Sequence, residues 1–97
     1  MFSARLINHN DTLMLNICDA DLLGRTLKRD NFTLKISEKC YAEKVVDKEE
    51  AKDLLKRSKS INMVGKEIIS LSVNMNIGSR AGVKEREGIP FLIVFKM

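Results

Sequence analysis

The chain has 97 residues, a formal net charge of +4, and 44% hydrophobic residues. A chain of this length folds as one domain, residues 1–97, with enough apolar side chains for a core that needs no disulfide staple. Its two cysteines, Cys18 and Cys40, are too few for a disulfide scaffold and lack metal-site spacing, which predicts a reducing compartment. The sequence has no apolar run of about 18–20 residues and no apolar signal core, so we expect a cytoplasmic protein outside the membrane.

The first 18 residues predict a β-hairpin. Apolar and polar residues alternate over 2–6 and again over 13–17, a pattern typical of half-buried strands. Asn8–Asp11 lies between these runs and has the composition of a four-residue turn.

The segment after the hairpin begins with a capping signal. Asp19 is placed to cap a short helical turn at 21–23, which Gly24 is able to end in a left-handed conformation. We expect a third strand at 33–36, after a polar break at 28–31.

The clearest local signal predicts a helix over 48–60. Asp47 precedes the helix, and Glu50 three residues later completes a capping box. Asp53 lies four residues before Arg57, a favourable spacing for a helical ion pair. The buried face is expected to comprise Ala51, Leu54, Leu55, Ser58 and either Ile61 or Asn62.

The next segment is ambiguous. Apolar and polar residues alternate strictly over 69–77, which favours a strand. Val64, Ile68, Leu71 and Met75 also fall on one face of a helix. Periodicity alone leaves both structures open.

The last quarter of the chain predicts an irregular stretch followed by a strand. Three glycines between residues 78 and 88 interrupt a polar segment that has room for one helical turn around 80–85. Ile89–Phe95 is an apolar run, and Pro90 suits the first residues of a strand because proline cannot donate to a ladder. Val94 and Phe95 would lie in a terminal strand able to pair with a second copy of the chain or another protein.

Several short motifs are distributed along nearly the whole chain. They are Met1-Phe2 with Arg5, Cys18-Asp19 with Leu22-Leu23-Gly24, Tyr41, Asn62 with Gly65, and Gly88-Ile89-Pro90. In this order they resemble a small archaeal family known as domain of unknown function four-two-four. The resemblance implies a compact α+β domain in which 65–75 is a helix ended by Asn76 in a left-handed conformation, and it implies no activity. In the family, His-Ala-Gln tends to follow Gly-Val-Pro. This chain departs from that pattern, because Phe91-Leu92-Ile93 follows its Gly88-Ile89-Pro90.

These patterns together predict an α+β fold. We expect a small antiparallel or mixed sheet, made of the N-terminal hairpin, the third strand and the C-terminal strand, packed against two helices.

The reactive side chains predict no catalytic centre, metal site or cofactor. A nucleophilic Cys18 would need His9 as its base and Asp19 as the orienting group, but the hairpin separates His9 from Cys18. One histidine and two distant cysteines cannot close a tetrahedral site, although Asp19 and Asp21 offer oxygens to a weakly held hard cation.

The segment from Asn62 to Gly65 is a hinge between a heavily charged segment and an almost uncharged one. Asn62 is able to cap a helix, and Gly65 allows close packing or a positive φ. Gly65-Lys66 at a helix start would also offer N–H groups and a cation to a phosphate. Close packing through Gly65 is the more common use of such a glycine.

The excess of positive charge lies in the middle of the chain. Residues 25–60 carry eleven basic and seven acidic side chains, whereas residues 1–24 have a net charge of −2. Mixed charge is typical of a solvated face, but a lysine row at helical spacing is able to follow a phosphate backbone. The row comprises Lys48, Lys52, Lys56 and Lys59, and Arg25, Lys28 and Arg29 extend it if the fold brings them near.

The sequence therefore predicts a non-enzymatic binding module whose partner is RNA or a ribonucleoprotein. The first alternative is protein association or a homo-oligomer formed through the C-terminal strand. The second is a cysteine-dependent enzyme centred on Cys18.

Overall fold

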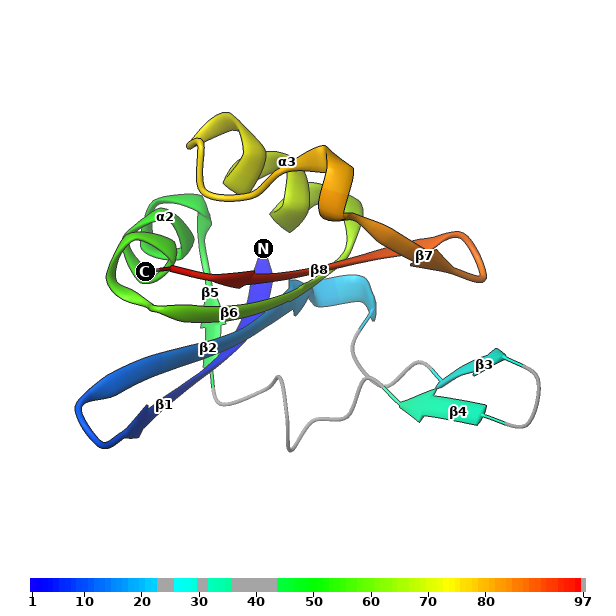
Figure 1. Cartoon of the computed structure of the whole chain (residues 1–97), viewed down its shortest axis with the longest axis horizontal. Helices are drawn as coiled ribbons and strands as arrows, with labels where there is room; N and C mark the ends of the chain where they lie inside the picture. Colours follow the sequence, from blue (N-terminus) through cyan, green and yellow to red (C-terminus); the bar gives the residue numbers. More distant parts are fainter. Residues whose placement is uncertain (23–25, 30–31, 36–43, 97) are drawn as a thin grey trace.

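The computed structural model describes residues 1–22, 26–29, 32–35 and 44–96. A six-stranded mixed sheet has the strand order β5-β1-β2-β6-β8-β7, and two α-helices pack on it (Figure 1). The chain is thus the small α+β fold that the sequence predicts. The strands of this sheet are β1 (Phe2–His9), β2 (Thr12–Asp19), β5 (Lys44–Val46), β6 (Ser60–Val64), β7 (Lys84–Arg86) and β8 (Ile89–Phe95).

The N-terminal hairpin is confirmed. β1 and β2 pair antiparallel from Phe2 opposite Asp19 to His9 opposite Thr12. The connection is a two-residue turn at Asn10 and Asp11, whose φ angles are 50° and 62°, instead of the expected four-residue loop. Asn and Asp adopt such angles more readily than most residues, which is why a two-residue turn is available here.

The expected third strand is present at β4 (Phe32–Lys35), but it pairs with β3 (Thr26–Arg29) in a separate two-stranded sheet. The polar break expected at 28–31 is wrong for Lys28 and Arg29, which belong to β3. In the main sheet, β6 occupies the inner position between β2 and β8. β6 runs parallel to β2 and antiparallel to β8, so the main sheet is mixed.

Helix α2 (Lys48–Arg57) begins as predicted and ends three residues early. Asp47 caps it, because its side chain accepts a hydrogen bond of 2.8 Å from the Glu50 N–H. The end is set by Ser58, which has extended backbone angles and whose hydroxyl donates to the Leu54 carbonyl. Ile61 and Asn62, expected on the helix face, therefore lie in β6.

The ambiguous segment is helical, as the family resemblance implies. α3 (Lys66–Asn74) buries Ile68, Ile69, Leu71 and Ser72. Asn76 follows it with a φ of 59°, and the N–H of Ile77 returns to the Ser72 carbonyl at 2.9 Å. This is the left-handed helix ending that an asparagine supports nearly as well as a glycine.

The C-terminal part contains the expected helical turn, η2 (Arg80–Gly82), and the expected strand β8. β7 was not foreseen, and it pairs with β8 only at residues 89–91.

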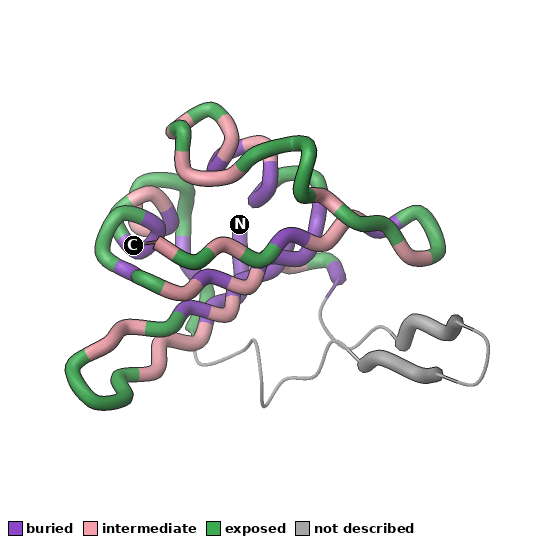
Figure 2. Tube along the Cα trace, viewed as in Figure 1, coloured by how far each residue is buried: buried purple, intermediate pink, exposed green. Residues whose placement is uncertain are grey.

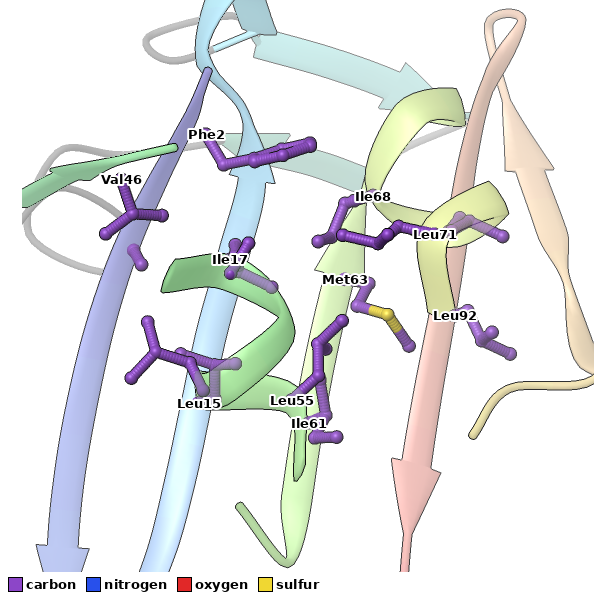
Figure 3. Packing of buried hydrophobic residues seen from close by; sticks show 14 residues of the cluster. Phe2, Leu15, Ile17, Val46, Leu55, Ile61, Met63, Ile68, Leu71 and Leu92 are labelled. Atoms are coloured by element: carbon purple, nitrogen blue, oxygen red, sulfur yellow. The ribbon is translucent and has the colours of Figure 1, made fainter. Parts of the chain in front are cut away.

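The main core lies between the sheet and the two helices, which pack on the same face (Figure 3). Leu15, Ile17, Ile61 and Met63 come from the central strands, and Leu55 comes from α2. Figure 2 shows that burial follows these strands and fades toward the hairpin tip and the turn before β8.

No described helix combines the length and the hydropathy that a membrane-spanning segment needs.

A smaller cluster lies on the other side of the sheet. Its buried members are Cys18, Leu22, Val64 and Ile89. Leu22 comes from η1 (Ala20–Leu22), the short turn after β2.

Candidate functional site around the start of helix α3

Asp19 fixes the start of α3. Its two carboxylate oxygens accept hydrogen bonds of 3.1 Å from the Glu67 N–H and 2.9 Å from the Ile68 N–H. The side chain is only 6% exposed. Asp19 was predicted to cap the turn at 21–23, but its carboxylate instead accepts from Glu67, 48 residues further along the chain.

Gly65 provides the space for this contact. Its φ is +118°, and a Cβ added there would lie 2.3 Å from Oδ2 of Asp19. Its N–H donates to the Pro90 carbonyl at 2.9 Å, which ties the helix start to β8. The expectation of close packing with a positive φ is met, whereas the N–H groups of Gly65, Glu67 and Ile68 are already bonded and are not free for a phosphate.

Burial raises the pKa of Asp19 above its ordinary value of 3.8. The two backbone hydrogen bonds act in the opposite direction, because they favour the carboxylate form. The nearby charges of Glu67 and Asp21 add to the increase.

Six residues of the family motifs meet at one cavity of about 290 Å³ beside this contact. The end of β2, the start of α3, the turn before β8 and the first residues of β8 contribute its lining, so residues far apart in sequence meet here. From the motif set it contains Asp19, Leu22, Gly65, Gly88, Ile89 and Pro90. Cys18 lies in the apolar cluster, whereas Asn62 lies inside β6 opposite Asn16 and caps no helix.

A second cavity, of about 460 Å³, brings together lysines from both helices. Lys48 comes from the first residue of α2, and Lys66 from the first residue of α3. Phe2 and Leu71 supply apolar lining. The remaining lining residues are Met1, Glu67, Ser70 and Asn74.

A third cavity, of about 500 Å³, lies on the other side of Lys66. Lys66 lines all three of these cavities. Arg80 adds a second cation to the third cavity, and Glu85 adds a carboxylate.

The lysine row is mostly exposed, but it does not form one continuous stripe along α2. Lys48 and Lys56 are exposed on α2, while Lys59 lies beyond the helix end, just before β6. Lys52 is half-buried, and its ammonium lies 3.5 Å from the Glu49 carboxylate. The expected pair of Asp53 and Arg57 is present, with Nε 3.0 Å from Oδ2.

The geometry around Cys18 does not support the cysteine-enzyme alternative. Cys18 is 0% exposed, and burial together with the charges of Asp19 and Asp21 raises its pKa to about 12. His9 pairs with Thr12 at the far end of the hairpin from Cys18. A buried thiol with a raised pKa is a poor nucleophile, because the thiolate is the reactive form.

Among the described residues no group of three or more His, Cys, Asp or Glu side chains is arranged to hold a metal ion. Several predicted residues lie outside the description: Gly24, Arg25, Cys40 and Tyr41 are not described, nor are the side chains of Lys28 and Arg29.

The comparisons agree with the motif pattern. The model of a family described as "Protein of unknown function (DUF424)" matches residues 7–97. The chain belongs to this family. It is also similar to the crystal structure of an uncharacterized conserved protein from Methanopyrus kandleri, with a TM-score of 0.79 and 26% identity over 99% of this chain and 93% of that one. No curated protein matches the chain.

The polar residues of α3 that line the second cavity were not among the predicted site residues. Glu67, Ser70 and Asn74 are spaced by three and four residues, so they share one helix face. This spacing is visible in the sequence, but it places the three side chains on one face only if the segment is a helix, and periodicity alone also allowed a strand.

Proposed function

We propose that this protein is a non-enzymatic module that binds RNA or a ribonucleoprotein through the lysines of α2 and the adjoining start of α3. The main support is that Lys48 and Lys66, from two different helices, line the same cavity at one end of the lysine row. The cationic surface thereby continues from one helix to the next.

The ion pairs of α2 support the same assignment. Glu49, Glu50 and Asp53 are each held by a cation, namely Lys52, Lys44 and Arg57 respectively. Within the described part of the chain, no carboxylate pairs with the remaining cations of this surface. These are Lys48, Lys56, Lys59 and Lys66, which we call the open lysines.

The spacing of the open lysines fits a backbone contact. Residues eight apart in an α-helix, such as Lys48 and Lys56, are separated by about 12 Å along its axis. Ammonium groups at such intervals bind phosphates as point charges and carry little sequence information. We therefore propose weakly sequence-specific binding.

The test is the affinity for a short single-stranded RNA, measured by fluorescence anisotropy. Lys56→Gln and Lys59→Gln are each expected to weaken binding about fivefold, because each removes one phosphate contact. Lys84→Gln is the matched control, since Lys84 is an exposed lysine on β7, an edge strand that is not part of α2 or α3. Equal effects at all three positions would reject the α2 surface.

A second candidate function is association through β8. β7 pairs with β8 only as far as Phe91, so no strand within the described residues pairs with the outer edge of residues 92–95. Ile93 and Phe95 are 59% and 74% exposed. An open edge with apolar side chains is a site for strand pairing with a second copy.

The oligomeric state tests this candidate. Ile93→Lys is the suitable variant, because Val94 packs against the core and a charge there would disturb folding. Light scattering that shows a dimer for the wild type and a monomer for Ile93→Lys supports association, and a wild-type monomer rejects it.

We also infer a cytoplasmic protein of archaeal origin. The free thiol of Cys18 and the relative from Methanopyrus kandleri support this inference. Fractionation of the native cell, with recovery in the membrane or secreted fraction, would contradict the location.

A further inference from the structure

We propose that the second cavity, lined by Lys48, Lys66, Glu67, Ser70 and Asn74, binds one ribonucleoside monophosphate unit. This inference deepens the proposed function and rests on it for the source of the ligand, which is the phosphorylated end of an RNA strand. Free ribonucleotides share the same chemistry, and the experiment below separates the two sources.

The five polar side chains of the cavity have no partner inside the described protein. No hydrogen bond or ion pair among the described residues engages the ammonium groups of Lys48 and Lys66, the Glu67 carboxylate, the Ser70 hydroxyl or the Asn74 amide. The Glu67 backbone N–H is bonded to Asp19, but its side chain is not. Polar groups that converge in this way on a hollow beside apolar surface are typical of a ligand site.

The two lysines define the anionic part of the ligand. With Glu67 present, the charged side chains of the lining have a net charge of +1. A terminal phosphate carries about −1.5 to −2 charges near neutral pH, more than the single charge of an internal phosphodiester. The two lysine cations that line the cavity therefore attract a phosphate monoester more strongly than an internal phosphodiester.

Glu67 defines the neutral polar part. A carboxylate accepts hydrogen bonds and repels phosphate, so it requires a ligand that also has donors. The hydroxyl groups of ribose are such donors, and acidic side chains bind them at nucleotide sites. Ser70 and Asn74, which both donate and accept, extend this polar wall.

The apolar lining accounts for the base. Phe2 and Leu71 are buried residues that border the cavity, and Met1 is exposed at its edge. The volume of about 460 Å³ lies within the range of small-molecule sites, about 300–1,000 Å³. A nucleotide has the phosphate, the hydroxyl donors and the apolar faces that the three parts of the lining select.

The first experiment measures binding of adenosine 5′-monophosphate, its 2′-deoxy analogue and adenosine to the full chain by titration calorimetry. We expect the ribonucleotide to bind more tightly than both others. Lys66→Gln is expected to weaken the ribonucleotide about tenfold and leave adenosine unchanged. Glu67→Gln is expected to reduce the preference for ribose over deoxyribose. Equal binding of the ribo and deoxy nucleotides by the wild type would overturn the assignment.

The second experiment compares RNA strands of one sequence that carry a 5′-phosphate, a 3′-phosphate or hydroxyl groups at both ends. We expect a phosphorylated end to strengthen binding, and Lys66→Gln to abolish the difference. Lys56→Gln should weaken all strands equally and preserve the difference. Urea unfolding midpoints of the variants confirm that each is folded.

The outcomes separate this inference from the proposed function. RNA binding that depends on Lys56 but ignores the strand end, with no nucleotide binding, overturns the inference and keeps the RNA-binding function. Nucleotide binding without RNA binding supports the cavity, assigns it to free nucleotides and overturns the RNA-binding function.

Discussion

The carboxylate of Asp19 lies directly over the α-carbon of Gly65 and bonds to the N–H groups of the two residues that follow Lys66. This contact joins the end of β2 to the start of α3. It thereby sets the position of Lys66, which borders all three cavities. The stability of the fold and the geometry of the candidate site therefore depend on the same pair of residues.

Replacing Asp19 with alanine removes this cap. We expect Asp19→Ala to lower the free energy of unfolding by about 2 kcal/mol, because two N–H groups lose their acceptor at a buried site. Urea denaturation measures the change. Asp21→Ala, at an exposed acid two residues away, should change stability by less than about 0.5 kcal/mol. Equal losses of unfolding free energy in the two variants would mean that the hydrogen bonds of Asp19 add no stability beyond that of an exposed acid.

Gly65→Ala tests the close approach itself. The added methyl group would collide with Asp19, and an L residue is strained at a φ of +118°. Gly88 also has a positive φ, but an added Cβ there would meet open space. We therefore expect Gly88→Ala to lower the free energy of unfolding less than Gly65→Ala does. In a double-mutant cycle, Gly65→Ala should cost less in the Asp19→Ala background than in the wild type. Additive losses would show that the two residues are not in contact.

The raised pKa of Asp19 predicts a particular dependence of stability on pH. The folded state holds the proton of Asp19 more tightly than the unfolded state, so the contribution of this group is largest below its ordinary pKa of 3.8. The contribution is lost as the pH rises through the higher folded pKa. The unfolding free energy of the wild type minus that of Asp19→Asn should therefore fall with rising pH across this window. A difference that grows over the same window would contradict the raised pKa.

Cys18 is expected to be inert in the folded protein. In a Cys40→Ser background, a thiol reagent should label Cys18 only after denaturant is added, because the thiol is buried and its pKa is about 12. Mass spectrometry measures the labelled fraction. Rapid labelling under native conditions would restore the cysteine-enzyme alternative.

The sequence predicted the elements whose signals are local. Asp47 and Glu50 marked the start of α2, and the alternation before Asp19 marked the hairpin. The end of α2 was misplaced because Ile61 also fits the helical face, whereas pairing of β6 with β2 and β8 makes it a strand residue. Periodicity does not contain information about such pairing.

The candidate site was predictable only in part. The lysines were found because they are spaced along one helix. The partner of Asp19 lies 48 residues away, so the capping role of Asp19 had no local signal in the sequence. The motif residues that meet near Gly65 were named from the family resemblance, and only the structure shows that they line one cavity. The polar face of α3 became recognisable only once the segment was known to be a helix.

The salt dependence of RNA binding is the decisive measurement for the proposed function. For a single strand, the logarithm of the affinity falls with the logarithm of the salt concentration by about 0.7 for each phosphate neutralised. Contacts from the open lysines predict a slope of roughly −2 to −3, and replacing Lys56 and Lys59 with glutamine should reduce that slope by about half. A flat slope, or a steep slope that these replacements leave unchanged, would contradict binding through the α2 surface.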